Sequence, residues 1–144
     1  MTEVVCDASV VVKWFKERGE SDVAPARAIR STHESGAVTA RVLDLTFLEV
    51  GNALTRADGW SARDVAESLD DLEALCGSGL RLTPYRRTAA ADVAAAFGLS
   101  FYDAAYFAVA TLLDFDLVSS DSDLIKMDAE APATYCERLG LPVG

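Results

Sequence analysis

The sequence predicts one α/β domain, with a central and mainly parallel sheet flanked by helices. Its 144 residues fit a single domain, and 51% hydrophobic with 25% charged residues is a globular composition. Short apolar runs with strand character alternate with segments of helical periodicity, a pattern typical of parallel sheets covered by helices. Neither a repeat nor a low-complexity linker divides the sequence. We therefore expect a single domain over residues 1–144.

The first half of the chain begins with the apolar run VVC, which has the length of a short buried strand. Pro25 suits the first turn of a helix, and Gly36 suits its end. From Asp44 onward, apolar residues recur on two faces of a helix, so most of that helix should be buried. The expected elements are a strand at residues 4–6, a helix through residues 10–15, a helix from Pro25 to Gly36, a strand at residues 38–43 and a helix at residues 44–57.

The second half continues the alternation of strands and helices. Ser61 and Asp64 form a capping-box signature ahead of an amphipathic helix. Ser100 is placed to cap a long apolar helix. The expected elements are a helix after Ser61, a strand at residues 80–83, helices at residues 88–97 and 101–113, a strand at residues 117–120 and an edge strand at residues 141–143.

The net charge of −10 disfavours a nucleic-acid partner, because phosphate binding needs a basic surface. A site for divalent cations must itself be acidic, however, so the charge does not exclude a nuclease. Two basic groups are candidates for contact with an RNA backbone, although a solvated face explains each group more simply. They are Arg81, Arg86 and Arg87 in one group, and Lys13, Lys16 and Arg18 in the other.

Histidine and cysteine usage narrows the chemistry. His33 is the sole histidine and lies near the end of a helix, where we expect a surface residue. A single histidine rules out a two-imidazole ribonuclease mechanism and histidine-rich zinc sites, and nothing places it in a Ser-His-Asp triad. Cys6, Cys76 and Cys136 lack CxxC spacing and are expected to be small buried or half-buried hydrophobic residues. An enzyme of this composition would depend on carboxylates and metal.

Four carboxylates are candidates for such a site. Asp7 and Asp121 each follow an apolar run with strand character, and parallel sheets form their sites at the carboxyl ends of the strands. Glu49 and Asp103 lie in strongly apolar helices, where an unpaired carboxylate has a large desolvation cost. A bound divalent cation would remove that cost, and oxygen ligands suit Mg²⁺ and Mn²⁺.

Each of the four also has a purely structural explanation. Asp7 could accept backbone hydrogen bonds in the turn after its strand. Asp103 stands three residues after Ser100, so it fits a capping box. Asp121 could be a turn residue or a helix N-cap, and Glu49 could lie on an exposed strip. Glu49 is the hardest to explain in this way, because its neighbours on the helix are apolar.

Four segments, taken together, resemble the PIN-domain family and within it the VapC-type toxins of toxin–antitoxin pairs. They are VVCDASVVVKWF at the start, LDLTFLEVGNAL around Glu49, LSFYDAAYFAVA around Asp103 and LVSSDSDL around Asp121. They occur in the family's order and at its usual separations over nearly the whole chain. The resemblance implies a PIN-like α/β/α sandwich, an RNA substrate, Mg²⁺ or Mn²⁺ as cofactor, a homodimer and a cognate antitoxin.

The same resemblance implies roles for individual residues. The residues that it assigns to the catalytic metal site are Asp7, Glu49, Asp103 and Asp121. Those that it assigns to supporting positions are Ser9, Asn52, Ser119 and Asp123, the last as an auxiliary acid. We expect Asp7 and Asp103 to bind metal directly, while Glu49 and Asp121 bind it directly or through water, or orient the attacking water. Leu43 stands where many relatives have a proline, which affects only the local loop geometry.

These expectations combine into metal-assisted hydrolysis of RNA phosphodiester bonds. Two alternatives stay open: a non-catalytic PIN module that binds RNA or an antitoxin, and another Mg²⁺-dependent phosphohydrolase on a similar fold. No apolar run reaches the length of a membrane span, and the N-terminus lacks the features of a signal peptide. We therefore expect a cytoplasmic protein without a membrane partner.

Overall fold

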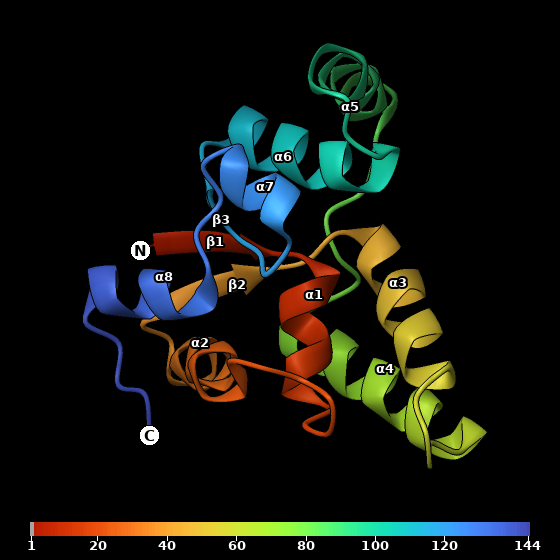
Figure 1. The fold of residues 1–144 in the computed structure, drawn as a ribbon, viewed down its shortest axis with the longest axis vertical. Helices are drawn as coiled ribbons and strands as arrows, with labels where there is room; N and C mark the ends of the chain where they lie inside the picture. The colour runs from red at the N-terminus through yellow and green to blue at the C-terminus, as the bar shows by residue number, and fades with distance from the viewer. Residues whose placement is uncertain (1) are drawn as a thin grey trace.

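A computed structural model describes residues 2–144, and its centre is a three-stranded parallel sheet (Figure 1). Strand β1 (Thr2–Cys6) lies in the middle, between β2 (Val38–Arg41) and β3 (Asp116–Val118). Val5 of β1 is in register with Arg41 on one side and with Leu117 on the other. The three carboxyl ends therefore meet at one edge of the sheet.

Helices connect the strands and surround them. They are α1 (Ala8–Val11), the 3₁₀ helix η1 (Val12–Trp14), α2 (Val23–Ser35), α3 (Asp44–Thr55), α4 (Ala62–Cys76), α5 (Pro84–Phe97), α6 (Phe101–Leu113), α7 (Ser122–Lys126) and α8 (Pro132–Leu139). The capping box expected at the start of α4 is confirmed, since Ser61 and Asp64 exchange hydrogen bonds of 3.1 and 3.2 Å.

Alternate side chains of β1 enter two separate cores, as the period of two in a strand requires. Val4 and Cys6 pack on one face with buried residues of α1, α2, α3, α4 and α8. Val5 packs on the other face with buried residues of α5, α6 and α7. Figure 1 shows α6 and α7 on one side of the strands, with α1, α2 and α8 on the opposite side. The predicted α/β/α class, with a parallel sheet flanked by helices, is confirmed.

The segment expected as a strand at residues 80–83 forms only one bridge to Leu43. Leu80 donates to the carbonyl of Val42 and accepts from the amide of Asp44, and the chain then leaves for a helix. That helix, α5, begins at Pro84, four residues earlier than expected, because Pro84 suits its first turn and Thr83 caps it. Gly79 allows the close approach: its φ is +88°, and a Cβ there would lie 2.7 Å from the backbone of Leu43.

The prediction of an edge strand at residues 141–143 is wrong. Residues 141–143 have no regular secondary structure, and they follow helix α8 (Pro132–Leu139), whose C-cap Gly140 has a left-handed conformation. In this part of the chain Glu130 extends the sheet, through a single bridge to Val118. One bridged residue ahead of a helix-starting proline carries no readable strand pattern, which explains the error.

The sequence also predicted the burial of four side chains, those of the three cysteines and His33. The expectation for the cysteines is confirmed, since Cys6 and Cys136 are buried and Cys76 is half-buried. His33 is not a plain surface residue: its Nδ1 accepts the Ala40 amide proton at 3.0 Å, and its Nε2 lies 2.5 Å from the Leu75 carbonyl. It thereby joins α2 to β2 and α4. Within residues 2–144, no single helix is long and apolar enough to cross a membrane, and only the bent pair α5 and α6 together has that length and composition.

Candidate functional site

The four candidate carboxylates come from four separate elements that meet at the carboxyl edge of the sheet. Asp7 directly follows β1 and is the N-cap of α1, and Asp121 follows β3 and is the N-cap of α7. Asp103 lies in the first turn of α6, and Glu49 lies in the middle of α3. The charges of Asp7 and Asp103 both act on Glu49, and the charge of Asp121 acts on Asp103, so the four acids influence one another electrostatically.

Asp7 lies in a nest of hydroxyl and amide donors. Its side chain is 4% exposed. The Ser9 hydroxyl donates to Oδ1 at 2.6 Å, and the Val10 amide donates to the same oxygen at 3.3 Å. The Ser119 hydroxyl donates to Oδ2 at 2.5 Å. A carboxylate offers about four lone-pair positions, so three donors orient Asp7 and leave part of its acceptor capacity unused.

The two serines also connect Asp7 to the last aspartate. Ser119 Oγ accepts the amide proton of Asp121 at 2.9 Å, while it donates its own proton to Asp7. Ser9 Oγ accepts the amide proton of Ser120 at 2.8 Å in the same manner. Both supporting serines therefore contact Asp7, and together they hold the loop after β3 against the end of β1.

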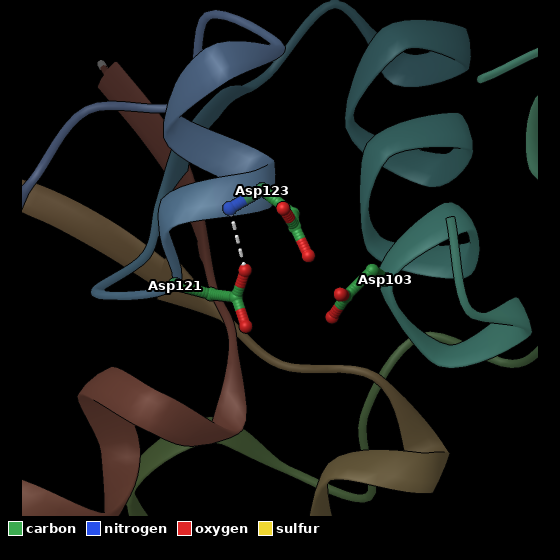
Figure 2. Close-up of side chains that lie close together, drawn as sticks. All are labelled: Asp103, Asp121 and Asp123. Atoms are coloured by element: carbon green, nitrogen blue, oxygen red, sulfur yellow. Dashed lines mark hydrogen bonds between the residues drawn. The ribbon is translucent and has the colours of Figure 1, made fainter. Parts of the chain in front are cut away.

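A second group of carboxylates lies across from Asp7. Asp103, Asp121 and Asp123 each bring one carboxylate oxygen within 4.8 Å of the others. Figure 2 shows Asp103 projecting from α6 towards Asp121 and Asp123 at the start of α7. The Asp123 amide donates to Asp121 Oδ1 at 2.8 Å, which fixes the Asp121 side chain. Of the two residues expected as direct metal ligands, this trio contains Asp103, and it also contains the auxiliary Asp123.

Glu49 is held by a chain of hydrogen bonds that the sequence analysis missed. The Tyr106 hydroxyl donates to Glu49 Oε1 at 2.8 Å and lies 2.7 Å from Thr46 Oγ1. Thr46 Oγ1 in turn accepts the Leu43 amide proton at 3.0 Å. One consistent direction of donation therefore runs from Leu43 through Thr46 and Tyr106 to Glu49. Tyr106 stands three residues after Asp103 on the same helix face, which places it near the candidate site, but no periodicity in α3 or α6 indicates its contact with Glu49.

Burial raises the proton affinity of the site. It raises the pKa of Asp7 to about 6, although the hydrogen bonds from Ser119, Ser9 and Val10 oppose the shift and the charge of Asp103 adds to it. Burial also raises the pKa of Glu49, and the Tyr106 hydrogen bond opposes that shift. For Asp103, burial and then the charge of Asp121 raise the pKa. Several partly buried acids with raised pKa values are a setting that a bound cation would relieve.

Asn52 is exposed and lies beside Glu49 in a hollow of about 370 Å³. Leu45 and Leu48 of the same helix and Tyr102 of α6 complete its walls. The hollow therefore adjoins the acidic group at Glu49, and the side chain of Asn52 supplies an amide group to its wall.

A parallel sheet with carboxylates gathered at its carboxyl edge defines an α/β protein with an oxygen-rich site, whose donor atoms are of the kind that bind divalent cations. Residues 4–130 match the PIN domain, and the chain belongs to the PIN-domain family.

The relatives agree with this membership. The chain is 34% identical over 140 residues to Ribonuclease VapC1 from two strains of Mycobacterium tuberculosis, and the alignment covers 95% of this chain and 96% of the relative. Among solved structures it is similar to PAE2754 from Pyrobaculum aerophilum, with a TM-score of 0.70 and 25% identity, over 96% of this chain and 90% of the other.

A more distant solved structure has the same fold. VapBC2 from Rickettsia felis, bound to a DNA fragment from their promoter, matches with a TM-score of 0.65 over 90% of this chain and 97% of the other. Its sequence identity of 7% supports a shared fold and nothing finer.

Proposed function

We propose that this protein is a metal-dependent ribonuclease of the VapC type, which hydrolyses RNA phosphodiester bonds at the acidic edge of its sheet. The observation that carries the proposal is the approach of Asp103, Asp121 and Asp123 to within 4.8 Å of one another, next to the buried Asp7. The likeness to a relative named Ribonuclease VapC1 supports RNA as the substrate. Asp103 comes from α6, whereas Asp121 and Asp123 come from the start of α7, where Ser119 accepts the amide proton of Asp121.

The donor set fits a divalent cation of the hard type. All the candidate ligands are carboxylate oxygens, and Mg²⁺ and Mn²⁺ prefer such ligands. Asp103, Asp121 and Asp123 would hold the ion, with Asp7 and Glu49 as further ligands, directly or through water. When bound, such an ion supplies Lewis acidity at a phosphate oxygen and a lowered pKa for a nearby water.

Asp7, Glu49 and Asn52 would have separate roles in the reaction. Asp7 is kept in one orientation by Ser9 and Ser119, so its free lone pairs point in a fixed direction. Glu49 keeps one oxygen on Tyr106, and burial raises its pKa, which makes it a stronger base for the proton of the attacking water. Asn52 would contact the RNA in the hollow beside Glu49.

The same proposal includes partners and a compartment. The resemblance to VapC-type toxins supports inhibition by a cognate antitoxin and a homodimeric assembly. The three free cysteines are in keeping with the reducing cytoplasm, where RNA is also present.

The test is a cleavage assay on a panel of structured RNAs with Mg²⁺, Mn²⁺ or EDTA. Wild-type protein should cleave with metal and not with EDTA. Asp103→Asn and Asp7→Asn should each lower cleavage by at least about 100-fold while circular dichroism shows an intact fold. Asp70→Asn, an exposed position on α4, removes the same charge elsewhere and should leave cleavage unchanged.

Two outcomes would replace the proposal. RNA binding without metal-dependent products would favour a non-catalytic binding module. Hydrolysis of small phosphate esters in preference to every RNA tested would favour a general phosphohydrolase.

A further inference from the structure

The cationic side chains of this acidic protein divide into paired and unpaired sets. Of the thirteen Lys and Arg residues, seven lie within 4.0 Å of a carboxylate. Within residues 2–144, the six without such a partner are Arg18, Arg56, Arg81, Arg86, Arg87 and Lys126. A polyanion would engage this second set first, because these side chains need not give up a carboxylate.

Three of the six belong to one short segment, which we call the α5 arginine cluster: Arg81, Arg86 and Arg87. Main-chain carbonyls orient two of its members: Arg86 Nη1 donates to the carbonyl of Arg81 at 2.7 Å, and Arg87 Nη1 donates to the carbonyl of Leu82 at 2.9 Å. A guanidinium has five N–H donors, so each of these residues keeps most of its donors for a ligand.

Short hydrogen bonds tie this segment to the helix that carries Glu49. The Asp44 amide donates to the Leu80 carbonyl at 3.0 Å, and the Leu82 amide donates to Asp44 Oδ2 at 3.1 Å. Asp44 is the first residue of α3, and Glu49 follows five residues later, about 7.5 Å along the helix axis. Figure 1 shows the connection from α4 to α5 passing beside the start of α3. The cluster is therefore near the acidic site without being part of it.

The other cations form weaker alternatives. Lys13 is 4% exposed and donates to Glu20 and to the Ser21 carbonyl, so it cannot contact RNA. Arg18 and Arg56 share a hollow with Lys16 and Asp58. Lys16 pairs with Glu20 at 3.1 Å, and Asp58 offsets part of the charge of the two arginines.

We propose that the α5 arginine cluster binds backbone phosphates of the RNA strand, a few nucleotides away from the bond that is cleaved. The proposal rests on the ribonuclease function proposed above and adds the surface that retains the substrate. Guanidinium groups bind phosphate through paired N–H donors, and this local positive charge offsets the repulsion from a net charge of −10. Tyr85, 73% exposed in the same turn of α5, offers a face for base stacking.

The test measures RNA binding apart from cleavage. Asp103→Asn protein in EDTA is titrated into a fluorescent single-stranded RNA that the wild type cleaves, over a range of KCl concentrations. Adding R81Q, R86Q and R87Q together should weaken binding by at least about tenfold at low salt. The slope of log Kd against log salt should fall by about 2, since each phosphate contact contributes about 0.7 for a single strand. The corresponding triple lysine variant should keep most of the slope.

Two single variants control for folding and for charge. Arg81→Gln removes a side chain with no partner among the described residues, and it should lower the slope by about 0.7. Arg63→Gln removes an exposed arginine that pairs with Glu67 at 3.1 Å, and it should change neither affinity nor slope.

Each contrary result has a distinct meaning. If the wild type cleaves RNA but the arginine variants keep its affinity and slope, the proposed surface is wrong and the proposed ribonuclease function stands. If the wild type neither binds nor cleaves any RNA, both are wrong. If the triple variant keeps its RNA affinity but changes the oligomeric state in light scattering, the cluster is a protein interface and the proposal is wrong.

Discussion

Ser119 donates a hydrogen bond of 2.5 Å to Asp7 across 112 residues of sequence, and it accepts the amide proton of Asp121 at 2.9 Å. One hydroxyl group therefore links the carboxylate of the first acid of the candidate site to the backbone of the last. The same bond fastens the loop after β3 to the end of β1, so it positions the site and closes this edge of the fold.

Replacing Ser119 with alanine should separate these two acids. We expect cleavage to fall by about 10- to 100-fold, the usual cost of losing a residue that orients a metal ligand. Because the Ser119 bond lowers the pKa of Asp7, the acid limb of the pH–rate profile should also shift to higher pH. Ser120→Ala is the matched control, since only the backbone amide of Ser120 contacts the site. An unshifted profile with full activity in Ser119→Ala would contradict this role.

Tyr106→Phe removes a hydroxyl that donates to Glu49 and lies within hydrogen-bond distance of Thr46. Burial, and then the charge of Glu49, hold the pKa of Tyr106 far above its usual value, so the hydroxyl stays protonated and available as a donor. Its loss should lower the free energy of unfolding by about 1–3 kcal/mol and reduce cleavage, because a buried threonine and a half-buried glutamate lose their partner. Urea unfolding and the cleavage assay measure the two effects.

Tyr135→Phe provides the comparison for that variant. Tyr135 Oη is buried and has no hydrogen-bond partner among the described residues. Its removal should leave the free energy of unfolding unchanged or raise it, and cleavage should not change. Equal destabilisation by both substitutions would mean that the Tyr106 hydroxyl has no special role.

Local interactions were predictable from the sequence, and long-range ones were not. The capping explanations for Asp7 and Asp121 are confirmed, since Asp7 accepts from Val10 and Asp121 accepts from Asp123. Each capping bond uses one oxygen of a carboxylate, so capping and membership of an acidic group are compatible. The two explanations therefore do not exclude one another.

The missed features all depend on residues that are distant in sequence. The Tyr106–Glu49 bond spans 57 residues, and no periodicity within either helix reveals it. His33 looks like a helix-end surface residue until Ala40 and Leu75 approach its two ring nitrogens. Lys13 looks solvated until Glu20 and the backbone of the following loop enclose it. Tertiary packing decides such contacts.

Asp123→Asn should weaken Mn²⁺ binding, because Asp123 is one of the three acids whose oxygens approach within 4.8 Å. Asparagine keeps the backbone amide that donates to Asp121, so the start of α7 should stay intact. We expect the dissociation constant for Mn²⁺ to rise by about tenfold in calorimetry or EPR titration, with cleavage partly restored at high metal concentration. Asp70→Asn controls for the change in net charge. Unaltered Mn²⁺ affinity would remove Asp123 from the proposed site.

The raised pKa of Asp7 predicts how the stability of the metal-free protein depends on pH. Its folded-state pKa is about 6, against about 3.9 in an unfolded chain. Protonated Asp7 therefore favours the folded state: the contribution is complete below about pH 4 and is lost as the pH rises through about 6. A shift of about 2 pKa units corresponds to about 3 kcal/mol.

To check this prediction, the free energies of unfolding of the wild type and of Asp7→Asn are compared by urea unfolding in EDTA. The measurements cover several pH values between about 4 and 7.5. Asparagine also loses hydrogen bonds, so only the pH dependence of the difference between the two proteins is informative. Glu49 and Asp103 titrate in both proteins and cancel to first order. Wild type should lose stability relative to the variant as the pH rises, and Mg²⁺ should restore it at pH 7.5 more than at pH 5, since the cation binds the ionised carboxylate. Parallel curves in EDTA would show that the pKa of Asp7 is not raised in the folded protein.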